Sequence, residues 1–461
     1  MQALRTRITN ASLLFVHRVV QDYLPHWSKW PGKIAGLDLG LLPLLLHRMI
    51  LQRMNLSAAA KAPRESLDTT RPVGVNYRPD DGYGVDAASP RAGMVNGVFG
   101  RNMPPRVSPP ARDSLPDVQH VAQRLLARKT FVPAGDQLNV LAAAWIQAMV
   151  HDWVGHHARL EDDVVLAKGA VSGCPMSTFR FHPTREMIDT PGAFANSRTH
   201  WWDASFVYGQ TPEAVTRART FHHGLLHTTG QTDGGSLPGD RQNSWIGVSL
   251  LQDLFIREHN AIATSIAQHH PELAGNDEKL FNRARLVVAA LVAKIHTVEW
   301  TPTLLKTPML ETAMKVSWFG LPLWPSLFRL IKGTTETHGV PFCLTEEFTA
   351  VYRLHAMLPD GLQVDAEYIP LENLLGAEGD RCLDVSGATM RFWKTIVREP
   401  CGALVPHNYP LWTRSVHPTT PDGEVLPSVD LAALDLYRDR ERGIPMYNAF
   451  RRHLHLRPCL D

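Results

Sequence analysis

The stretch AWIQAMVHDW, at residues 144–153, lies inside a pattern that predicts a helix over residues 138–157. On a helix, Gln147 and His151 are four residues apart and share one face, whereas Asp152 points about a quarter-turn away. One helix could thus present a polar pair to a pocket and a carboxylate to a separate ion. The stretch alone leaves open a second interpretation, in which His151 is a core histidine with satisfied hydrogen bonds.

The patterns on either side of this stretch predict a mostly α-helical chain. Further helices are predicted over residues 249–270, 278–305, 344–357 and 431–440, and strand-like alternation is sparse. Residues 58–116 are rich in Pro, Gly, Asp, Arg and Ser, which is typical of an irregular arm. We therefore predict an N-terminal helical region over residues 1–57, the arm over 58–116, and one large domain over 117–461.

Composition and charge exclude several classes of protein. The chain has 461 residues, and its 47 Lys and Arg against 45 Asp and Glu give a net charge of +2, so there is no basic footprint for nucleic acid. Hydrophobic residues at 44% and charged residues at 20% indicate a globular protein. The five cysteines are far apart and never form CxxC, which argues against a disulfide framework or zinc ribbon and favours a reducing compartment.

The N-terminal region has the pattern neither of a signal peptide nor of a membrane span. Its first apolar stretch is broken by His17 and Arg18, and the apolar run 41–46 is interrupted by Pro43 and is too short to cross a bilayer. Two interpretations stay open: an amphipathic segment on a membrane surface, or helices packed on the protein body. We expect a cytoplasmic or peripheral membrane protein. The candidate interfacial anchors are Tyr23, Trp27 and Trp30.

A second stretch, THWWDAS at residues 199–205, places oxygen-bearing side chains at 199, 203 and 205. A hard cation such as Ca²⁺ takes six to eight oxygen ligands, and a tight loop can supply several of them. The alternative is an ordinary Ser/Thr/Asp turn that bonds to its own backbone.

A third stretch, FTAVYRLHAMLPD at residues 348–360, places Tyr352 and His355 three residues apart. On a helix they would lie on adjacent turns of one face. If His355 binds a haem iron, Tyr352 lies close to the same macrocycle and could lose an electron and a proton. The alternative is a tyrosine and a histidine packed in a core.

Together these stretches resemble the animal-type haem peroxidase and cyclooxygenase superfamily, and most closely its fatty-acid α-dioxygenases from plants and bacteria. The resemblance implies a mostly α, haem-peroxidase-like domain of the prostaglandin-synthase and myeloperoxidase type. It covers essentially the whole chain, although this chain ends at Asp461, before the C-terminal extension of the family. The matching segments are 145–153, 199–208, 255–260, 293–301, 352–360, and 430–434 followed by 437–442.

The resemblance assigns a role to each matching residue. His151 and Gln147 match the distal pair that handles peroxide, and His355 matches the proximal iron ligand. Tyr352 matches the tyrosine that becomes the hydrogen-abstracting radical, and His296 matches the histidine that contacts the substrate carboxylate. The residues that match the calcium site are Asp152, Thr199, Trp201 through its carbonyl, Asp203 and Ser205.

The implied cofactors are non-covalent haem b and Ca²⁺, and the implied activity is fatty-acid α-dioxygenation. Peroxide would oxidise the haem, the Tyr352 radical would take a hydrogen from the carbon beside the carboxylate, and O₂ would add there. Two other functions stay open: a haem peroxidase with general donors, and a haem-binding relative without turnover. We expect a monomer with no nucleic-acid partner.

This chain departs from the family pattern at its C-terminus, in the segment around residues 241–244 and at residue 435. The family's extension carries an arginine that pairs with the substrate carboxylate, and Lys294, Arg451 or Arg452 could replace it. Arg241 is offset by one position from a family arginine. Ser244 or a neighbour stands where some peroxidases have a haem-ester glutamate, which favours non-covalent haem. Asp435 replaces an asparagine beside the proximal histidine, where a carboxylate would lower the iron's reduction potential.

Overall fold

The computed structural model describes most of the chain, with gaps between the described ranges. The described residues are 2–24, 29, 41–54, 57–58, 70–104, 115–167, 176, 178–188, 190–228, 244–319, 342–417 and 427–459. Two of the predictions fall on other residues: Arg241, and the interfacial anchors Trp27 and Trp30.

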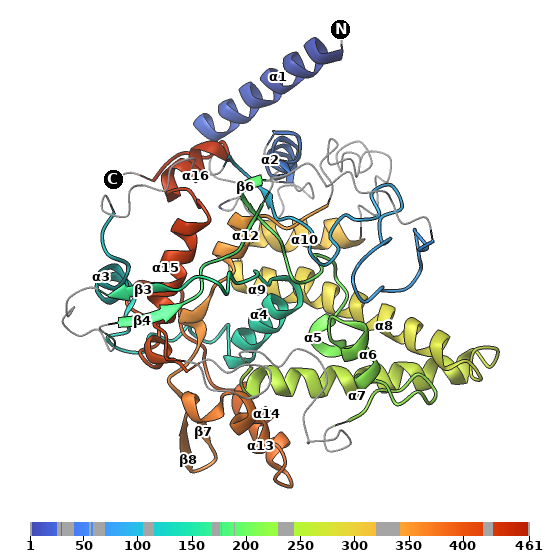
Figure 1. Ribbon diagram of the computed structural model, residues 1–461. Helices are drawn as coiled ribbons and strands as arrows, with labels where there is room; N and C mark the ends of the chain where they lie inside the picture. Colours follow the sequence, from blue (N-terminus) through green and yellow to red (C-terminus); the bar gives the residue numbers. More distant parts are fainter. Residues whose placement is uncertain are drawn as a thin grey trace.

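Helices dominate the described chain (Figure 1). The α-helices are α1 (Gln2–Tyr23), α2 (Leu41–Met54), α3 (Val118–Val121), α4 (Val140–Trp153), α5 (Ser205–Tyr208), α6 (Pro212–Ala218), α7 (Ile246–His269), α8 (Asp277–Lys294), α9 (Thr301–Leu305), α10 (Pro308–Phe319), α12 (Glu346–Val351), α13 (Gly376–Arg381), α14 (Ala388–Ile396), α15 (Leu431–Glu441) and α16 (Tyr447–His453). The π-helices are η3 (Ala122–Leu126) and η4 (Ile295–Trp300), and the 3₁₀-helices are η5 (His355–Met357), η6 (Leu371–Leu374) and η7 (Trp412–Ser415).

Strands are short and pair only as antiparallel two-stranded sheets within the described ranges. Their order is β1–β2, β3–β4, β5–β6 and β7–β8. The bounds are β1 (Ser57–Ala58), β2 (Gly100–Arg101), β3 (Val164–Ala167), β4 (Thr178–Phe181), β5 (Glu186–Met187), β6 (Thr190–Phe194), β7 (Gly361–Val364) and β8 (Glu367–Pro370). The prediction of a mostly α-helical fold is confirmed.

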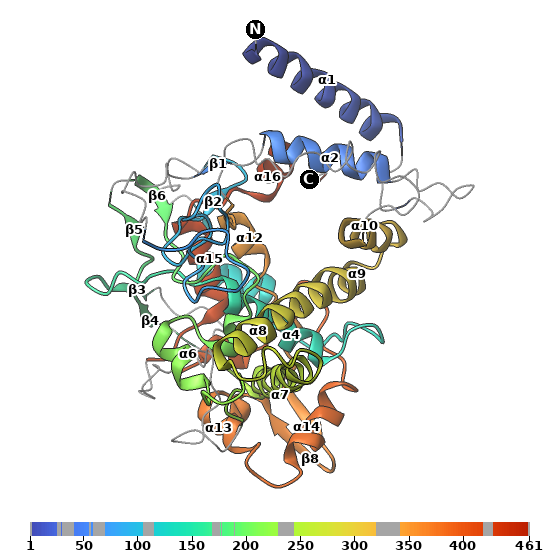
Figure 2. The same ribbon diagram turned by 90° about the vertical axis from the view of Figure 1, so that its right-hand side faces the viewer.

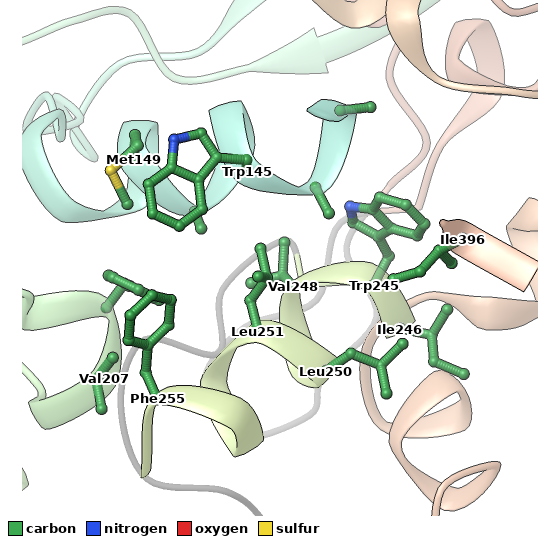
Figure 3. Packing of buried hydrophobic residues seen from close by; sticks show 14 of the residues in the cluster. Trp145, Met149, Val207, Trp245, Ile246, Val248, Leu250, Leu251, Phe255 and Ile396 are labelled. Carbon is green, nitrogen blue, oxygen red and sulfur yellow. The ribbon is translucent and has the colours of Figure 1, made fainter. Parts of the chain in front are cut away.

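Helix α4 lies at the centre because its sequence is apolar on nearly every side. Its buried residues Trp145 and Met149 face Val248, Leu251 and Phe255 of α7 across the largest core cluster (Figure 3). Gln147 and His151 are only partly buried, whereas Asp152 is fully buried. The two faces expected from the spacing are therefore present.

Helices α7 and α8 form a long pair that supports α4, and both views show them side by side (Figure 2). Helix α8 begins after Asn276, whose side chain accepts the Lys279 N–H and so caps the first turn. The predicted helix over 278–305 is interrupted, because residues 295–300 form the π-helix η4 before α9 continues. Single-turn π-helices inside α-helices are frequent at functional sites, and this one carries His296.

The predicted helix over 344–357 is wrong as a single element. Helix α12 ends at Val351, Tyr352 adopts φ −80° and ψ 8°, and His355 begins the 3₁₀-helix η5. Tyr352 and His355 therefore do not lie on one face of a continuous helix. The physical reason is tertiary: their side chains bond to different elements, and β-branched Thr349 and Val351 make the local helix preference weak.

Helix α1 projects from the body and is attached at the C-terminal half of the helix (Figures 1 and 2). His17 stacks on His47 of α2 with ring centroids 4.6 Å apart, and Asp22 forms a 2.7 Å ion pair with Arg457. Phe15 and Tyr23 are 69% and 82% exposed. No helix in the described ranges combines the length and the apolarity that crossing a bilayer requires.

Candidate active site

Tyr352 and His296 meet at the start of η4, although 56 residues separate them in sequence. The Nε2 atom of His296 lies 3.2 Å from the Tyr352 hydroxyl, and Trp145 Nε1 donates to His296 Nδ1 at 3.1 Å. Tyr352 is held by the end of α12, His296 by the π-helix, and Trp145 by the second turn of α4. Three elements thus converge on one hydrogen-bonded chain.

Aromatic rings enclose this pair. Trp300 stacks on the His296 ring at 4.9 Å, and Phe348 lies 4.1 Å from the Tyr352 ring. Trp153 and Trp202 approach the same imidazole at 5.2 and 5.4 Å. An enclosure of this kind excludes water and strengthens the polar contacts inside it.

Burial also sets the protonation of the pair. Desolvation lowers the pKa of His296 to about 4, so the imidazole is neutral at physiological pH. Desolvation raises the pKa of Tyr352 to about 12, so this residue keeps its phenolic proton. At physiological pH the neutral imidazole of His296 therefore faces the protonated phenol of Tyr352.

His355 is held by two partners on one ring nitrogen. Its Nδ1 lies 3.0 Å from Asp435 Oδ2 on α15 and 3.0 Å from the Tyr409 hydroxyl, and Tyr409 donates to Asp435 Oδ2 at 3.1 Å. Arg353 is a further cation beside Asp435, at 3.5 Å from Oδ1. This arrangement leaves Nε2 as the ring nitrogen for a metal and fixes the direction in which it points.

The carboxylate of Asp435 stays ionised in this setting. Burial alone would raise its pKa, but the His355 ring, Arg353 and the Tyr409 hydroxyl together lower the pKa below its ordinary value. Burial and the neighbouring Asp435 raise the pKa of Tyr409 far above the range of an ordinary tyrosine. Tyr409 therefore acts as a neutral donor, and Asp435 as a charged acceptor.

The residues present fit a haem. A haem-ligating histidine usually donates its second ring N–H to a carboxylate or carbonyl, and His355 Nδ1 is placed to do so with Asp435. The side chain of His355 is 29% exposed, although its Nδ1 partners are buried or partly buried. Gln147 and His151, the predicted distal pair, lie on the half-buried face of α4. Helix α4 contacts η5, the element that carries His355.

The predicted cation ligands also come together. Ser205 Oγ and the Phe206 N–H donate to Asp152 Oδ1 at 3.1 and 3.0 Å, while Thr199 Oγ1 donates to Asp203 Oδ2. Asp152 Oδ2 is buried and, within the described part of the chain, accepts no hydrogen bond. All four of these side chains, on Asp152, Thr199, Asp203 and Ser205, are at most 1% exposed.

The backbone of this loop is strained between its ligand residues. Ala204, which separates Asp203 from Ser205, has φ 56°, in the left-handed region that costs a non-glycine residue energy. Burial and the adjacent Asp203 raise the pKa of Asp152 well above its ordinary value, and burial likewise raises the pKa of Asp203. Two buried acids that destabilise each other's charge are an environment that a cation would relieve.

Sequence reasoning missed several residues of both sites. Arg285 is fully buried near the acid pair, where Nε approaches the Asp203 carbonyl at 3.5 Å and Nη1 forms an ion pair with Asp80. Tyr409 was also not predicted, and neither was the hydrogen bond from Trp145 to His296. Hydrogen bonds between residues far apart in sequence leave no spacing pattern.

In the described ranges no group of three or more His, Cys, Asp or Glu side chains forms a metal site.

Three cationic residues were predicted as possible partners of the substrate carboxylate, and the structure places them elsewhere. Lys294 forms an ion pair with Glu299, and Arg451 donates to the Arg457 carbonyl at 2.6 Å. Arg452 is exposed on α16. His296 is the polar side chain that contacts the Tyr352 hydroxyl in the described structure, so the site combines one oxidisable phenol with one neutral imidazole.

Comparison with known proteins gives a consistent picture. The family model described as animal haem peroxidase matches residues 77–460. Alpha-dioxygenase 1 of Arabidopsis thaliana is 38% identical over 97% of this chain and 74% of its own length. The crystal structure of Oryza sativa fatty acid alpha-dioxygenase has a TM-score of 0.85 and 36% identity, covering 98% of this chain and 78% of that one. A variant of the same rice protein, solved with palmitic acid, has the same TM-score and coverage.

Proposed function

The chain belongs to the animal haem peroxidase family and is an alpha-dioxygenase relative within it, and on this premise we propose that it is a haem-dependent fatty-acid alpha-dioxygenase. The reaction adds O₂ at the carbon next to the carboxylate and gives a 2-hydroperoxy fatty acid. The substrates are a fatty acid, O₂ and an activating peroxide.

The observation that carries this proposal is the 3.2 Å contact between His296 and Tyr352. A carboxylate that accepts a hydrogen bond from His296 has its own α-carbon as the carbon nearest to the Tyr352 oxygen. Holding a head group beside the abstracting atom selects one C–H bond by position. A histidine and a tyrosine that were far apart would not favour the α-carbon over others along the chain.

Each residue of the site has a defined task in the proposed reaction. Haem, when bound at His355, supplies the one-electron oxidant that peroxide generates. His151 takes the proton from the peroxide and returns it, and Gln147 orients the peroxide on the same face of α4. Tyr352 loses a hydrogen atom, abstracts one from the α-carbon, and returns it to the peroxyl product after O₂ has added. The surrounding tryptophans exclude water.

The proposal is tested by O₂ uptake with palmitate in the haem-loaded chain. We expect Tyr352→Phe to reduce uptake by at least about a thousandfold, because the abstracting oxygen is lost, while peroxide-dependent oxidation of a small phenol persists. Tyr208→Phe is the matched control, since it removes another buried hydroxyl, which bonds to His259 outside the site. Uptake that survives in Tyr352→Phe contradicts the radical role, and a wild-type chain that oxidises only the phenol is a general haem peroxidase.

We also propose that Asp152, Asp203, Thr199, Ser205 and the Trp201 carbonyl bind Ca²⁺. The buried acid pair and the unbonded Asp152 Oδ2 support this ligand set, since burying a charged carboxylate without a partner is costly. Because Asp152 follows His151 directly on α4, the cation would fix the end of the helix that carries the distal histidine.

Metal analysis tests the calcium proposal. We expect about one Ca²⁺ per chain, lost in Asp152→Asn, with a lower melting temperature after chelation. Asp253→Asn is the control, because Asp253 is another buried acid but forms an ion pair with Arg257. Wild-type protein that contains no calcium after purification in calcium buffer rules out the site.

We further propose that α1 rests on an anionic lipid surface. Phe15, Val19 and Tyr23 recur every four residues on an exposed stripe of the helix. Asp22, the only acid in the sequence of α1, is paired with Arg457, and the helix sequence carries three arginines, a charge that anionic lipid would complement. Contact with a membrane would bring the enzyme to a source of fatty acid.

Vesicle flotation tests this contact. We expect the chain to float with phosphatidylglycerol-containing vesicles, and the double variant Phe15→Ser/Tyr23→Ser to stay in the dense fraction. The control variant Tyr368→Ser/Met390→Ser removes two similarly exposed side chains from other elements and should still float. Equal flotation of both variants rules out α1 as the contact.

A further inference from the structure

The hydrogen bond between Trp145 and His296 determines which nitrogen of His296 carries its proton. An indole N–H can only donate, and it points at His296 Nδ1 from 3.1 Å. Both side chains are buried, Trp145 at 5% exposed and His296 at 4%, so water does not replace either partner. Nδ1 is therefore the acceptor and carries no proton.

The proton of the neutral ring must then be on Nε2, which faces Tyr352. A neutral imidazole has one N–H, and excluding Nδ1 leaves Nε2 as its only position. His296 is the donor in its 3.2 Å contact with Tyr352, and the Tyr352 hydroxyl oxygen is the acceptor. The hydroxyl hydrogen of Tyr352 must point elsewhere, because an O–H cannot donate into an N–H.

We infer that Trp145 is a positioning residue that holds His296 in the tautomer protonated at Nε2, and so sets the polarity of the site beside Tyr352. The role in catalysis rests on the proposed function, whereas the tautomer does not. A substrate carboxylate can only accept hydrogen bonds, so it meets a donor in this tautomer and would meet a lone pair in the other.

The inferred tautomer also limits where the Tyr352 hydrogen can go. Nε2 of His296 already carries a proton, and Nδ1 is engaged by Trp145, so His296 is not the base for Tyr352. The N–H···O bond uses a lone pair of the phenolic oxygen and therefore persists after the hydrogen atom has left. A bound carboxylate competes with this oxygen for the single N–H, so the bond from His296 to Tyr352 belongs to the substrate-free site. The low pKa of His296 agrees with a ring that stays neutral throughout.

Trp300 offers a matched comparison with Trp145. Both are buried tryptophans that touch the His296 ring, and both donate their indole N–H to a buried acceptor. Trp300 stacks on the ring at 4.9 Å but donates to the Ala142 carbonyl at 3.2 Å, whereas Trp145 donates to the imidazole itself. Replacing each with phenylalanine removes similar volume and one N–H, but only one variant removes the bond to His296.

The experiment measures the His296 tautomer directly. Holoenzyme labelled with ¹⁵N-histidine is examined by NMR in its diamagnetic ferrous carbon-monoxide form, and the His296 signals are assigned by their loss in His296→Gln. We expect an unprotonated Nδ1 and a protonated Nε2 in wild type and in Trp300→Phe, and a rise in the Nδ1-protonated fraction in Trp145→Phe. A protonated Nδ1 in wild type overturns the inference whatever the two tryptophan variants show.

Two further measurements test whether Trp145 affects the proposed reaction at Tyr352. In peroxide-treated holoenzyme, the Tyr352 radical should show coupling to one exchangeable deuteron in wild type and Trp300→Phe, and weaker coupling in Trp145→Phe. The kcat for α-oxygenation should fall up to about tenfold in Trp145→Phe, the effect of losing one hydrogen bond. Unchanged coupling in Trp145→Phe, or an equal change in Trp300→Phe, overturns the role of Trp145. Failure of α-oxygenation itself would appear as absent O₂ uptake with the NMR result intact.

Discussion

Replacing Asp435 with asparagine would exchange the charged acceptor of His355 Nδ1 for a neutral one. A carboxylate acceptor gives the imidazole more anionic character and favours ferric iron, so its loss should raise the ferric/ferrous potential. We expect a rise on the order of 60 mV, a tenfold change in a one-electron equilibrium, measured by spectroelectrochemistry of the haem-loaded chain.

Asp439→Asn is the control for this change. Asp439 also bonds to Arg353, at 3.1 Å, and lies one helical turn beyond Asp435 on α15. The control should leave the potential within a few tens of millivolts of wild type. A potential that is unchanged in Asp435→Asn would mean that the carboxylate does not act through the proximal imidazole.

At the residue scale, sequence reasoning located side chains better than it located their partners. The pairing of Asp435 with His355 was predicted from a family position, and the structure brings the two side chains together. Tyr409, which bonds to both, was missed, since nothing in the segment around residue 409 differs from an ordinary buried tyrosine. The partner of a buried polar group is decided by tertiary packing.

Gly402 marks a close passage between two elements beside the proximal turn. Its N–H donates to the Met357 carbonyl at 2.9 Å, and a Cβ at this position would lie 2.1 Å from the Ala356 carbonyl oxygen. The added methyl group of Gly402→Ala must therefore displace the backbone of the 3₁₀-helix that begins at His355. We expect a loss of about 1–3 kcal/mol in the free energy of unfolding, measured by urea denaturation, and weaker haem retention.

Gly275→Ala is the matched control, because a Cβ there has no atom within 4 Å in the described structure. That variant should be neutral or more stable, through the reduced freedom of the unfolded chain. Equal stability of Gly402→Ala and wild type would show that the turn after Tyr352 can shift without cost, and so that η5 is not held rigidly.

At the element scale, the predicted helix bounds were correct where a capping side chain defines the end of the helix. The helix predicted over 431–440 matches α15 to within one residue, because the Asp430 side chain accepts the Ala433 N–H and caps its start. The segment 344–357 failed because its end is set by contacts with η4 and α15. The π-helix at His296 could not be predicted either, since it changes the backbone bonding without changing the apolar pattern.

The whole molecule should be sensitive to mild acid. Burial lowers the pKa of five histidines to about 4, from an ordinary value of 6.5: His17, His156, His200, His259 and His296. Between these two pH values the unfolded chain binds protons that the folded chain does not, so the free energy of unfolding must fall as the pH falls. Each histidine should cost about 2 kcal/mol at pH 5.

Urea denaturation at a series of pH values between 7.5 and 5 measures this slope. We expect the free energy of unfolding to fall by up to about 10 kcal/mol across the range, with unfolding taking up protons. His259→Gln should reduce the slope by about one proton, roughly 1.4 kcal/mol per pH unit, and provides an internal check. A free energy of unfolding that does not change over this range would mean that these rings are protonated in the folded state.

Two residues, Arg353 and Leu354, separate Tyr352 from His355, and the two side chains are anchored to different elements. In the proposed reaction Tyr352 is oxidised by the haem held at His355, and this short covalent link limits how far apart the phenol and the haem ligand can lie. We expect an insertion between positions 352 and 355 to remove this limit and to slow the oxidation of Tyr352 as the two side chains move apart.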